Sequence, residues 1–221
     1  MKFEKTEVWG FEHAIRGMRN PLESWNKSDS FIKSPHNYYV IGEKDLELMQ
    51  KLIKAGSEHR KFLRQIFVSV DITAPLYFFK ELDTYKVGTV ANSTSTMHKL
   101  ASTPITIDCF EMDDFERYLE TPLEDGENEE QWKFWNRELI PRLEALRQKY
   151  NETKDKRYWK ELIRLLPESW LQKRTITMNY ENILNMYRQR KNHKLTEWSK
   201  SFCDWVKTLP YAEELICLEQ E

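Results

Sequence analysis

Hydrophobic residues along the chain recur with the spacings of both helices and strands. From Glu43 to Ala55 the apolar positions follow helical spacing, and Gly42 and Gly56 flank them, which predicts an amphipathic helix. Residues 65–73 (QIFVSVDIT) alternate in polarity and are rich in β-branched residues, as in a strand with one buried face. Ala74-Pro75 follows directly. Because proline suits the first position of a helix, we expect the strand to turn into a helix there.

The second half of the chain is predicted to be largely helical, including its C-terminal third. Apolar spacing predicts helices over residues 132–150, 158–166, 179–191 and 195–209. Residues 1–42 are mixed and rich in turn formers, so a short strand or helix followed by loop is expected there. A chain of 221 residues without an internal repeat favours a single domain over residues 1–221.

Residues 111–130 form an acidic segment that ends in Glu124-Asp125-Gly126-Glu127-Asn128-Glu129-Glu130. A run of like charges is most often solvated, so we expect an exposed excursion between two elements rather than a linker between domains. The sequence indicates no partner for it.

Composition argues against several classes of protein. Lys and Arg number 34 against 36 Asp and Glu, and the net charge of −2 argues against nucleic-acid binding through bulk positive charge. Eight Trp, ten Tyr and eleven Phe are too many for a disordered chain, and the apolar runs are too short to cross a bilayer. The three cysteines lack metal-ligand spacing, so we expect neither disulfides nor a zinc site. The N-terminus lacks the apolar core of a signal peptide, which is typical of a cytoplasmic protein.

A run of small polar residues, Gly88 to Thr96, is the first candidate for a binding site. It consists largely of hydroxyl and amide side chains, and Lys86 precedes it. We interpret it as a loop whose backbone N–H groups, hydroxyls and lysine could hold a phosphate. Neither a Walker pattern nor a glycine fingerprint accompanies it, so a plain polar surface loop is the alternative.

Three asparagines at intervals of three form the second candidate. Asn179, Asn182 and Asn185 lie on one side of a predicted helix that ends near Arg190. Asparagine is a poor helix former, so its repetition on one face needs a reason. Two interpretations stay open: a solvated face whose cations complement the helix C-terminus, or contacts to an anionic, amide-bearing ligand such as a nucleotide or flavin.

The order of four elements resembles that of a known family: the strand ending in Ala74-Pro75, the helix after it, the hydroxyl-rich segment and the asparagine-rich helix. Over roughly residues 40–210 this order is similar to that of the flavin-dependent thymidylate synthases, the ThyX family. Counting without gaps from Ala74-Pro75 places the family's signature, Arg-His-Arg-x-x-Ser-x-Asn-Glu-x-Ser-x-Arg-Tyr, on residues 84–97. Lys86 keeps a positive charge there, and Thr89 and Thr94 keep hydroxyls. The signature's first Arg, its His, its Glu and its last Arg are replaced by Thr84, Tyr85, Asn92 and Thr96.

A second segment resembles the family more closely. Leu166-Pro167, Thr177, Asn179, Asn185 and Arg190 stand at the family's spacing without a gap. The resemblance implies that the two asparagines contact the flavin and that Arg190 holds the pyrimidine substrate. The full set of implied residues is His59, Lys86, Thr89, Asn179 and Asn185 for the cofactor, and Asn92, Thr94, Ser95 and Arg190 for the substrate, with Arg190 also expected in catalysis.

The resemblance also implies a fold, a reaction and an assembly. The implied fold is α+β, with a central mostly antiparallel sheet, flanking helices and a helical C-terminal third. The implied reaction is the reductive methylation of dUMP to dTMP with methylenetetrahydrofolate, in which electrons pass from NADPH through FAD. The family builds its sites between subunits of a homotetramer, so Arg164, Arg188 or Lys191 could replace the missing charges. The altered signature leaves open a divergent member that binds a pyrimidine nucleotide or flavin but modifies another substrate or is not catalytic.

Overall fold

The computed structural model describes residues 1–35, 38–122 and 128–218. The chain forms two compact units, each built from several stretches of sequence. Unit 1 comprises Met1, Thr73–Lys80 and Ser93–Arg174, and unit 2 comprises Lys2–Ile72, Glu81–Asn92 and Thr175–Glu221. The single domain that the sequence favours stays a prediction.

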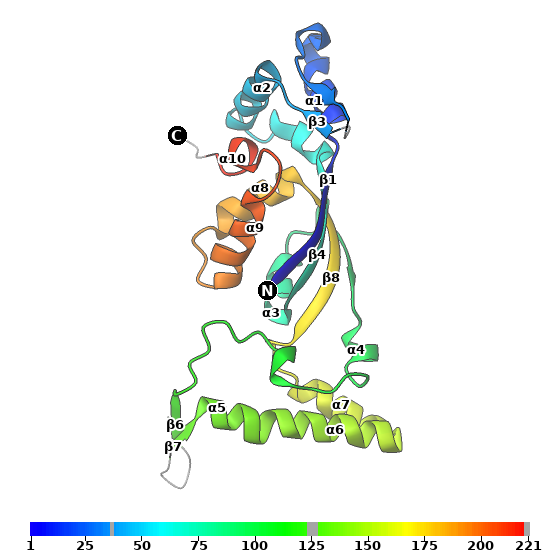
Figure 1. Cartoon of the computed structure of the whole chain (residues 1–221), viewed down its shortest axis with the longest axis vertical. Helices are drawn as coiled ribbons and strands as arrows, with labels where there is room; N and C mark the ends of the chain where they lie inside the picture. The colour runs from blue at the N-terminus through cyan, green and yellow to red at the C-terminus, as the bar shows by residue number, and fades with distance from the viewer. Residues whose placement is uncertain (36–37, 123–127, 219–221) are drawn as a thin grey trace. The chain divides into compact units, whose positions relative to one another are not determined.

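A four-stranded sheet has the strand order β1 (Lys2–Trp9), β4 (Phe67–Pro75), β8 (Leu171–Asn179) and β5 (Val90–Ser93). Figure 1 shows the first three side by side. The Tyr180 N–H donates to the Ile66 carbonyl at 2.9 Å, and the Leu76 N–H donates to the Trp170 carbonyl at 3.1 Å. Residue numbers therefore rise along β4 as they fall along β8, so this central pair is antiparallel. The α+β fold class predicted from the sequence is confirmed.

Alternate residues of β4 face the core, as its sequence predicts. Val68, Val70, Ile72 and Ala74 are buried, and Asp71 between them accepts a hydrogen bond from Thr175 Oγ1 at 2.6 Å. Helix α3 (Leu76–Leu82) begins one residue after Pro75, which is the last residue of β4. The expected corner between strand and helix is therefore present, with the proline on its strand side.

Helices form much of the core of unit 2. In chain order they are α1 (Phe11–Arg19), η1 (Asn20–Leu22), η2 (Trp25–Lys27), α2 (Glu43–Lys54), η3 (Arg60–Gln65), α8 (Tyr180–Arg190), the π-helix η6 (Glu197–Phe202), α9 (Cys203–Lys207) and α10 (Ala212–Leu215). In Figure 1, α8, α9 and α10 lie on one side of the sheet. Trp198 and Phe202 are fully buried, as their apolar stripe predicts.

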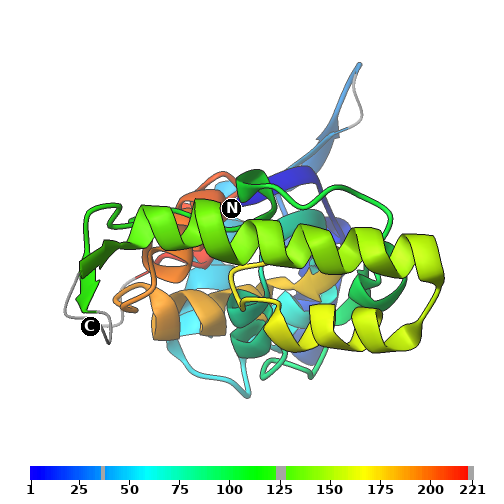
Figure 2. The same ribbon diagram turned by 90° about the horizontal axis from the view of Figure 1, so that it is seen from below.

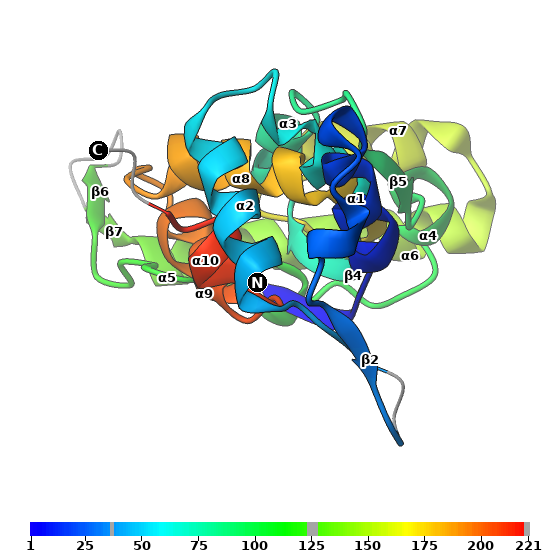
Figure 3. The same ribbon diagram turned by 90° about the horizontal axis from the view of Figure 1, so that it is seen from above.

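Residues 1–42 are more regular than the sequence suggests. After β1 and α1, the short strands β2 (Phe31–Lys33) and β3 (Tyr38–Val40) pair antiparallel. Figure 3 shows this hairpin projecting away from α1 and α2. The expected loop is therefore wrong in part, because backbone pairing between two short segments turns it into a hairpin. His36 and Asn37, in the predicted turn, lie outside the described residues.

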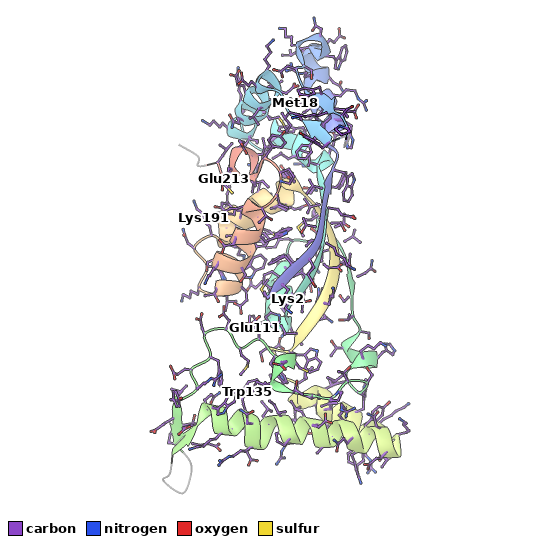
Figure 4. The ribbon with its side chains drawn as sticks, viewed as in Figure 1. Lys2, Met18, Glu111, Trp135, Lys191 and Glu213 are labelled. Atoms are coloured by element: carbon purple, nitrogen blue, oxygen red, sulfur yellow. The ribbon has the colours of Figure 1, made fainter. Side chains whose placement is uncertain are left out.

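Unit 1 is built around a pair of helices. A continuous helical stretch consists of α5 (Gln131–Lys133), the π-helix η5 (Phe134–Leu139) and α6 (Ile140–Thr153), and α7 (Lys156–Leu165) follows. Figure 2 shows α6 and α7 side by side. Leu143 and Leu162 are fully buried in a cluster with Leu100, Ile105, Phe110 and Trp135. Figure 4 labels Trp135 of this cluster. The helices predicted over residues 132–150 and 158–166 are both confirmed.

The acidic segment follows η4 (Ile107–Cys109) and contains the antiparallel strands β6 (Glu120–Pro122) and β7 (Asn128–Glu130). Tyr118 and Leu119 are exposed, in keeping with the expected excursion. The run Glu124–Glu127 lies outside the described residues.

The hydroxyl-rich segment differs from its prediction as a loop. Residues 90–93 form β5, and a short helix, α4 (Thr96–Lys99), follows. All four β5 residues are exposed, so no buried apolar face drives this strand. Its position beside β8 is fixed instead by backbone pairing, and at its end the Thr94 N–H donates to the Lys173 carbonyl at 2.8 Å. Such pairing across the sequence leaves no local pattern to predict it.

Candidate functional site

The start of α8 is held by two of the predicted asparagines. Asn179 is the residue before the helix, and its side-chain oxygen accepts from the Asn182 N–H at 3.0 Å. The Asn182 side-chain oxygen accepts in return from the Asn179 N–H at 3.3 Å, which completes a capping box. The poor helix propensity of asparagine is therefore no obstacle, because Asn179 sits at the position where it is favoured.

The turn after Lys86 lies against this helix start. Asn182 Nδ2 donates to the Val87 carbonyl at 2.6 Å. Gly88 has φ +76°, and a Cβ there would come within 2.7 Å of Asn179 Nδ2. Only glycine meets both demands without strain. The turn thereby brings Lys86 and Thr89 beside Asn179, three of the five cofactor residues that the resemblance implies.

One face of α8 faces the basic helix η3. Glu181 and Asn185 are one turn apart, and Arg60 bonds to both, with Nε 3.2 Å from Glu181 Oε1 and an Nη2 hydrogen bond of 3.0 Å to Asn185 Oδ1. Arg64 also pairs with Glu181. Arg188, on the next turn of the same face, has a buried Nη2 with no hydrogen-bond partner among the described residues. Burial, and then the charge of Arg60, lower the pKa of Arg188.

Arg190, at the end of α8, is held by three side chains. Its Nη2 forms an ion pair with Glu81 Oε2 at 2.6 Å, and its Nε donates to the Tyr85 hydroxyl at 2.9 Å. The Tyr85 hydroxyl donates in turn to Gln189 Oε1 at 2.8 Å. The Tyr85 and Trp198 rings lie 5.6 and 5.3 Å from the guanidinium, within the range of cation–π attraction.

A small cavity of about 180 Å³ opens beside this network. Its wall includes Tyr85, Lys86 and Thr89, together with Leu82, Asp83, Ala91 and Ile176. Thr89 Oγ1 is buried and has no hydrogen-bond partner in the part of the chain that the structure describes. A buried hydroxyl without a partner costs free energy, so this atom is a candidate for contact with a ligand.

A larger cavity of about 1170 Å³ lies among α1, α2 and η3. His59, the residue before η3, lines it. Lys44, Lys61 and Arg64 contribute positive charge to the lining, and Leu48, Leu52 and Phe62 contribute apolar surface. Met18, labelled in Figure 4, lies on its wall. Apolar surface combined with a few charged groups is typical of pockets for organic ligands.

The implied residues do not all lie in one place. Within unit 2, Lys86, Thr89 and Asn179 lie around Gly88. Arg190 adjoins this group through its hydrogen bond to Tyr85. Asn185 accepts a hydrogen bond from Arg60, and His59 directly precedes Arg60 in the chain. Asn92 is exposed on β5. Thr94 and Ser95 belong to unit 1 and have structural partners there. Thr94 Oγ1 bonds to Lys173 at 3.2 Å, and Ser95 Oγ caps α4 through the His98 N–H at 3.2 Å.

Sequence reasoning missed Glu81, Arg60 and Glu181 as parts of this region. Glu181, Asn185 and Arg188 recur at the helical interval that puts them on one face, and that spacing was a readable signal. The partners Glu81 and Arg60 lie far away in sequence and left no such signal. Among the described residues no cluster of His, Cys, Asp and Glu suits a metal ion, and none of their helices is long and apolar enough to cross a membrane.

Comparison with known proteins identifies the fold. The sequence matches no protein-family model, and a search of curated proteins finds no significant match. Solved structures do match: flavin-dependent thymidylate synthase ThyX from Helicobacter pylori, complexed with FAD and dUMP, has a TM-score of 0.68 at 18% identity, covering 99% of this chain and 100% of that one. A second structure of the same protein with FAD and dUMP gives 0.68 at 17% identity, covering 98% and 97%.

A third match has a different name. The UMP/dUMP methylase PolB from Streptomyces cacaoi, bound with 5-Br dUMP, gives a TM-score of 0.61 at 12% identity, covering 98% of this chain and 94% of that one. The protein therefore has an α+β fold of the kind found in enzymes that act on uridine nucleotides. In particular it has the fold of flavin-dependent thymidylate synthase ThyX, as the resemblance in sequence implied.

Proposed function

We propose that this chain is a flavin-dependent enzyme of the thymidylate synthase type. It binds FAD and methylates dUMP reductively to dTMP, with methylenetetrahydrofolate as carbon donor and NADPH as the source of electrons. It acts in the cytoplasm as a homotetramer. The observation that carries the proposal is the convergence of Lys86, Thr89 and Asn179 around Gly88 in a fold whose solved relatives were crystallised with FAD and dUMP.

The residues present suit a flavin dinucleotide. Its diphosphate needs hydrogen-bond donors and positive charge, and two buried donors, Thr89 Oγ1 and Arg188 Nη2, have no partner among the described residues. Lys86 lies beside the first. The cavity at His59 has a volume of about 1170 Å³. Most small-molecule sites span roughly 300–1000 Å³, so this cavity is large enough for a ligand of the size of a dinucleotide. Of the residues that the resemblance assigns to the flavin, His59 would contact it in this cavity, and Lys86 and Thr89 would contact it at the smaller one, beside Asn179; Asn185 bonds to Arg60.

Bound FAD would supply the redox chemistry, and the chain supplies binding and orientation. Lys86 balances phosphate charge and Thr89 donates a hydrogen bond. Arg190 donates to an acceptor atom of the pyrimidine nucleotide, and Tyr85 fixes the plane of its guanidinium by accepting from Nε. No cysteine is required as a nucleophile. Burial raises the pKa of the Cys203 thiol to about 11, so this thiol stays protonated at neutral pH.

The test is an absorbance titration of the purified chain with FAD, followed by dUMP. We expect flavin bands that shift on binding and shift again with dUMP. Lys86→Gln should weaken FAD binding about tenfold, as loss of one charge-assisted hydrogen bond would. Lys99→Gln, at an exposed lysine beyond the segment, is the matched control and should not weaken it. A chain that binds no flavin at saturating concentration would overturn the proposal.

A second candidate is a protein on the same fold that binds a nucleotide or flavin without making dTMP. The ion pair between Glu81 and Arg190 favours it, because the arginine implied for the substrate is already occupied. Methylation at C5 of the pyrimidine replaces its hydrogen, so release of tritium from [5-³H]dUMP separates the two. Release that depends on FAD, NADPH and the folate supports the enzyme, and bound flavin without release supports the alternative.

A further inference from the structure

We propose that Glu81 is an internal competitor for Arg190, so that a nucleotide gains Arg190 only by displacing the Glu81 carboxylate. The inference rests on the proposed function, which places a uridine nucleotide at Arg190. It adds a residue that sets the affinity and selectivity of that site, and it assigns this role to a side chain outside the residues that the resemblance implies.

The contacts of Arg190 differ in how firmly they are fixed. On one side the guanidinium faces Trp198, which is fully buried, and the ring of Tyr85. Its Nε is tied to the Tyr85 hydroxyl, which is itself tied to Gln189. These groups form a wall that keeps the guanidinium in place. A further contact joins Nη2 to Glu81, whose side chain is partly exposed to solvent.

The exposure of the two partners supports this asymmetry. The Arg190 side chain is 17% exposed, whereas that of Glu81 is 40% exposed. Glu81 lies in the last turn of α3 and can swing into water without disturbing the core. A ligand oxygen that approaches from solvent therefore meets the Nη2 donor at the position that a Glu81 oxygen now occupies, 2.6 Å away.

The strength of the competition depends on the charge of the ligand. A carboxylate and a phosphate oxygen both seek the same guanidinium donors, and the two anions repel each other at short range. A neutral carbonyl of the pyrimidine competes for the same donor but is not repelled. Glu81 therefore penalises ligands in proportion to the negative charge that they bring to Arg190.

The experiment compares Glu81→Gln with the wild type by calorimetric titration of the full chain, with and without FAD. The probes are dUMP, deoxyuridine and inorganic phosphate. Glutamine keeps the shape and removes the charge, so we expect dUMP to bind about tenfold more tightly, the effect of losing one such competing contact. A rise for phosphate assigns Arg190 to the phosphoryl group, and a rise for deoxyuridine assigns it to the base.

Two controls keep the result interpretable. Glu168→Gln removes a carboxylate from a comparable ion pair, with Lys80 at 2.7 Å in unit 1, and should leave dUMP affinity unchanged. Glu81→Asp keeps the charge but shortens the reach, and should give an intermediate gain. It also serves if the glutamine variant does not fold. Adding Arg190→Gln to Glu81→Gln should abolish the gain.

The outcomes separate this inference from the proposed function. Equal dUMP affinities in wild type and Glu81→Gln overturn the competition and leave the proposed function standing. A gain for inorganic phosphate without any binding of dUMP or deoxyuridine supports the competition and overturns the proposed nucleotide. Absence of binding by every probe to every variant overturns both.

Discussion

The Arg19 guanidinium and the Asp45 carboxylate form a nearly fully buried ion pair in unit 2. Arg19 Nε lies 2.6 Å from Asp45 Oδ1, and their side chains are 5% and 0% exposed. The other carboxylate oxygen accepts from the hydroxyls of Ser28 and Ser30, each at 2.6 Å. The pair joins the end of α1 to α2, two elements that line the large cavity.

Asp45→Asn should lower the free energy of unfolding by about 3–5 kcal/mol, because it leaves the Arg19 charge buried without a counter-charge. Chemical denaturation measures the change. Asp155→Asn is the matched control: it removes the charge from an exposed pair with Arg157 but keeps a good N-cap for α7. Its expected effect is small, because water screens this pair. Similar small losses in both variants would contradict a structural role for the buried pair.

Gly88→Ala tests the turn that brings Lys86 and Thr89 to Asn179. Gly56 provides the comparison, because it has φ +106° with open space around it, whereas Gly88 has φ +76° and would crowd Asn179. Gly56→Ala should cost about 1 kcal/mol from the left-handed backbone alone. Gly88→Ala should cost at least about 1 kcal/mol more, since the asparagine must shift.

Thermal and denaturant unfolding compare the two glycine variants, and FAD titration provides a second readout. We expect only Gly88→Ala to weaken FAD binding. Equal losses of stability and unchanged FAD affinity would show that the close approach of Gly88 to Asn179 has no consequence.

Some of this architecture was readable from sequence because the signal is local. Period-two burial in β4 and the helical spacing that buries Met49 and Ile53 in α2 both follow from which face meets a core. The strand β5 was not readable, because its four residues are all exposed and only pairing with β8 defines it.

The candidate site shows the same limit. Asn179 and Asn182 were singled out by spacing, but their capping role depends on where the helix begins, and sequence patterns place helix ends poorly. Tyr85 and Arg190 are 105 residues apart, so nothing local indicates that one bonds to the other. Long-range contacts of charged side chains decide the electrostatics of this site, and a single sequence does not encode them in any periodic form.

Arg188→Gln should have opposite effects on stability and on ligand binding. The buried Nη2 has no partner among residues 1–35, 38–122 and 128–218, and the positive charge of Arg60 lies nearby. Removing the charge should raise the free energy of unfolding of the ligand-free chain by about 1 kcal/mol. If the site takes a phosphate, the same variant should bind FAD more weakly.

Arg142, exposed on α6, is the control for Arg188. Arg142→Gln should change neither quantity. Denaturation with and without FAD measures both effects in one series. A loss of stability in the ligand-free Arg188→Gln variant would mean that the arginine has a structural role, not one reserved for an anion.

The lowered pKa of Glu144 predicts how the stability of unit 1 depends on pH. Hydrogen bonds from Arg147 come first among the causes that lower the pKa of Glu144 to about 2, and they outweigh the effect of burial. The Ile105 N–H, 2.9 Å from Oε2, adds to the shift. Because the folded-state value lies below the ordinary value of 4.5, the stabilisation is complete above pH 4.5 and is lost as the pH falls toward 2.

Glu144→Gln should therefore lower the free energy of unfolding at pH 7 by about 2 kcal/mol, a figure that allows for partial solvent screening. The difference from the wild type should shrink below pH 4.5 and disappear only below pH 2, where the wild-type carboxyl is also protonated. Urea denaturation at a series of pH values measures it. Glu152→Gln, in an exposed pair with Lys149 at 3.8 Å, should show little effect at any pH. A Glu144→Gln deficit that stays constant down to pH 2 would mean that packing or hydrogen bonding, not the charge, accounts for the loss.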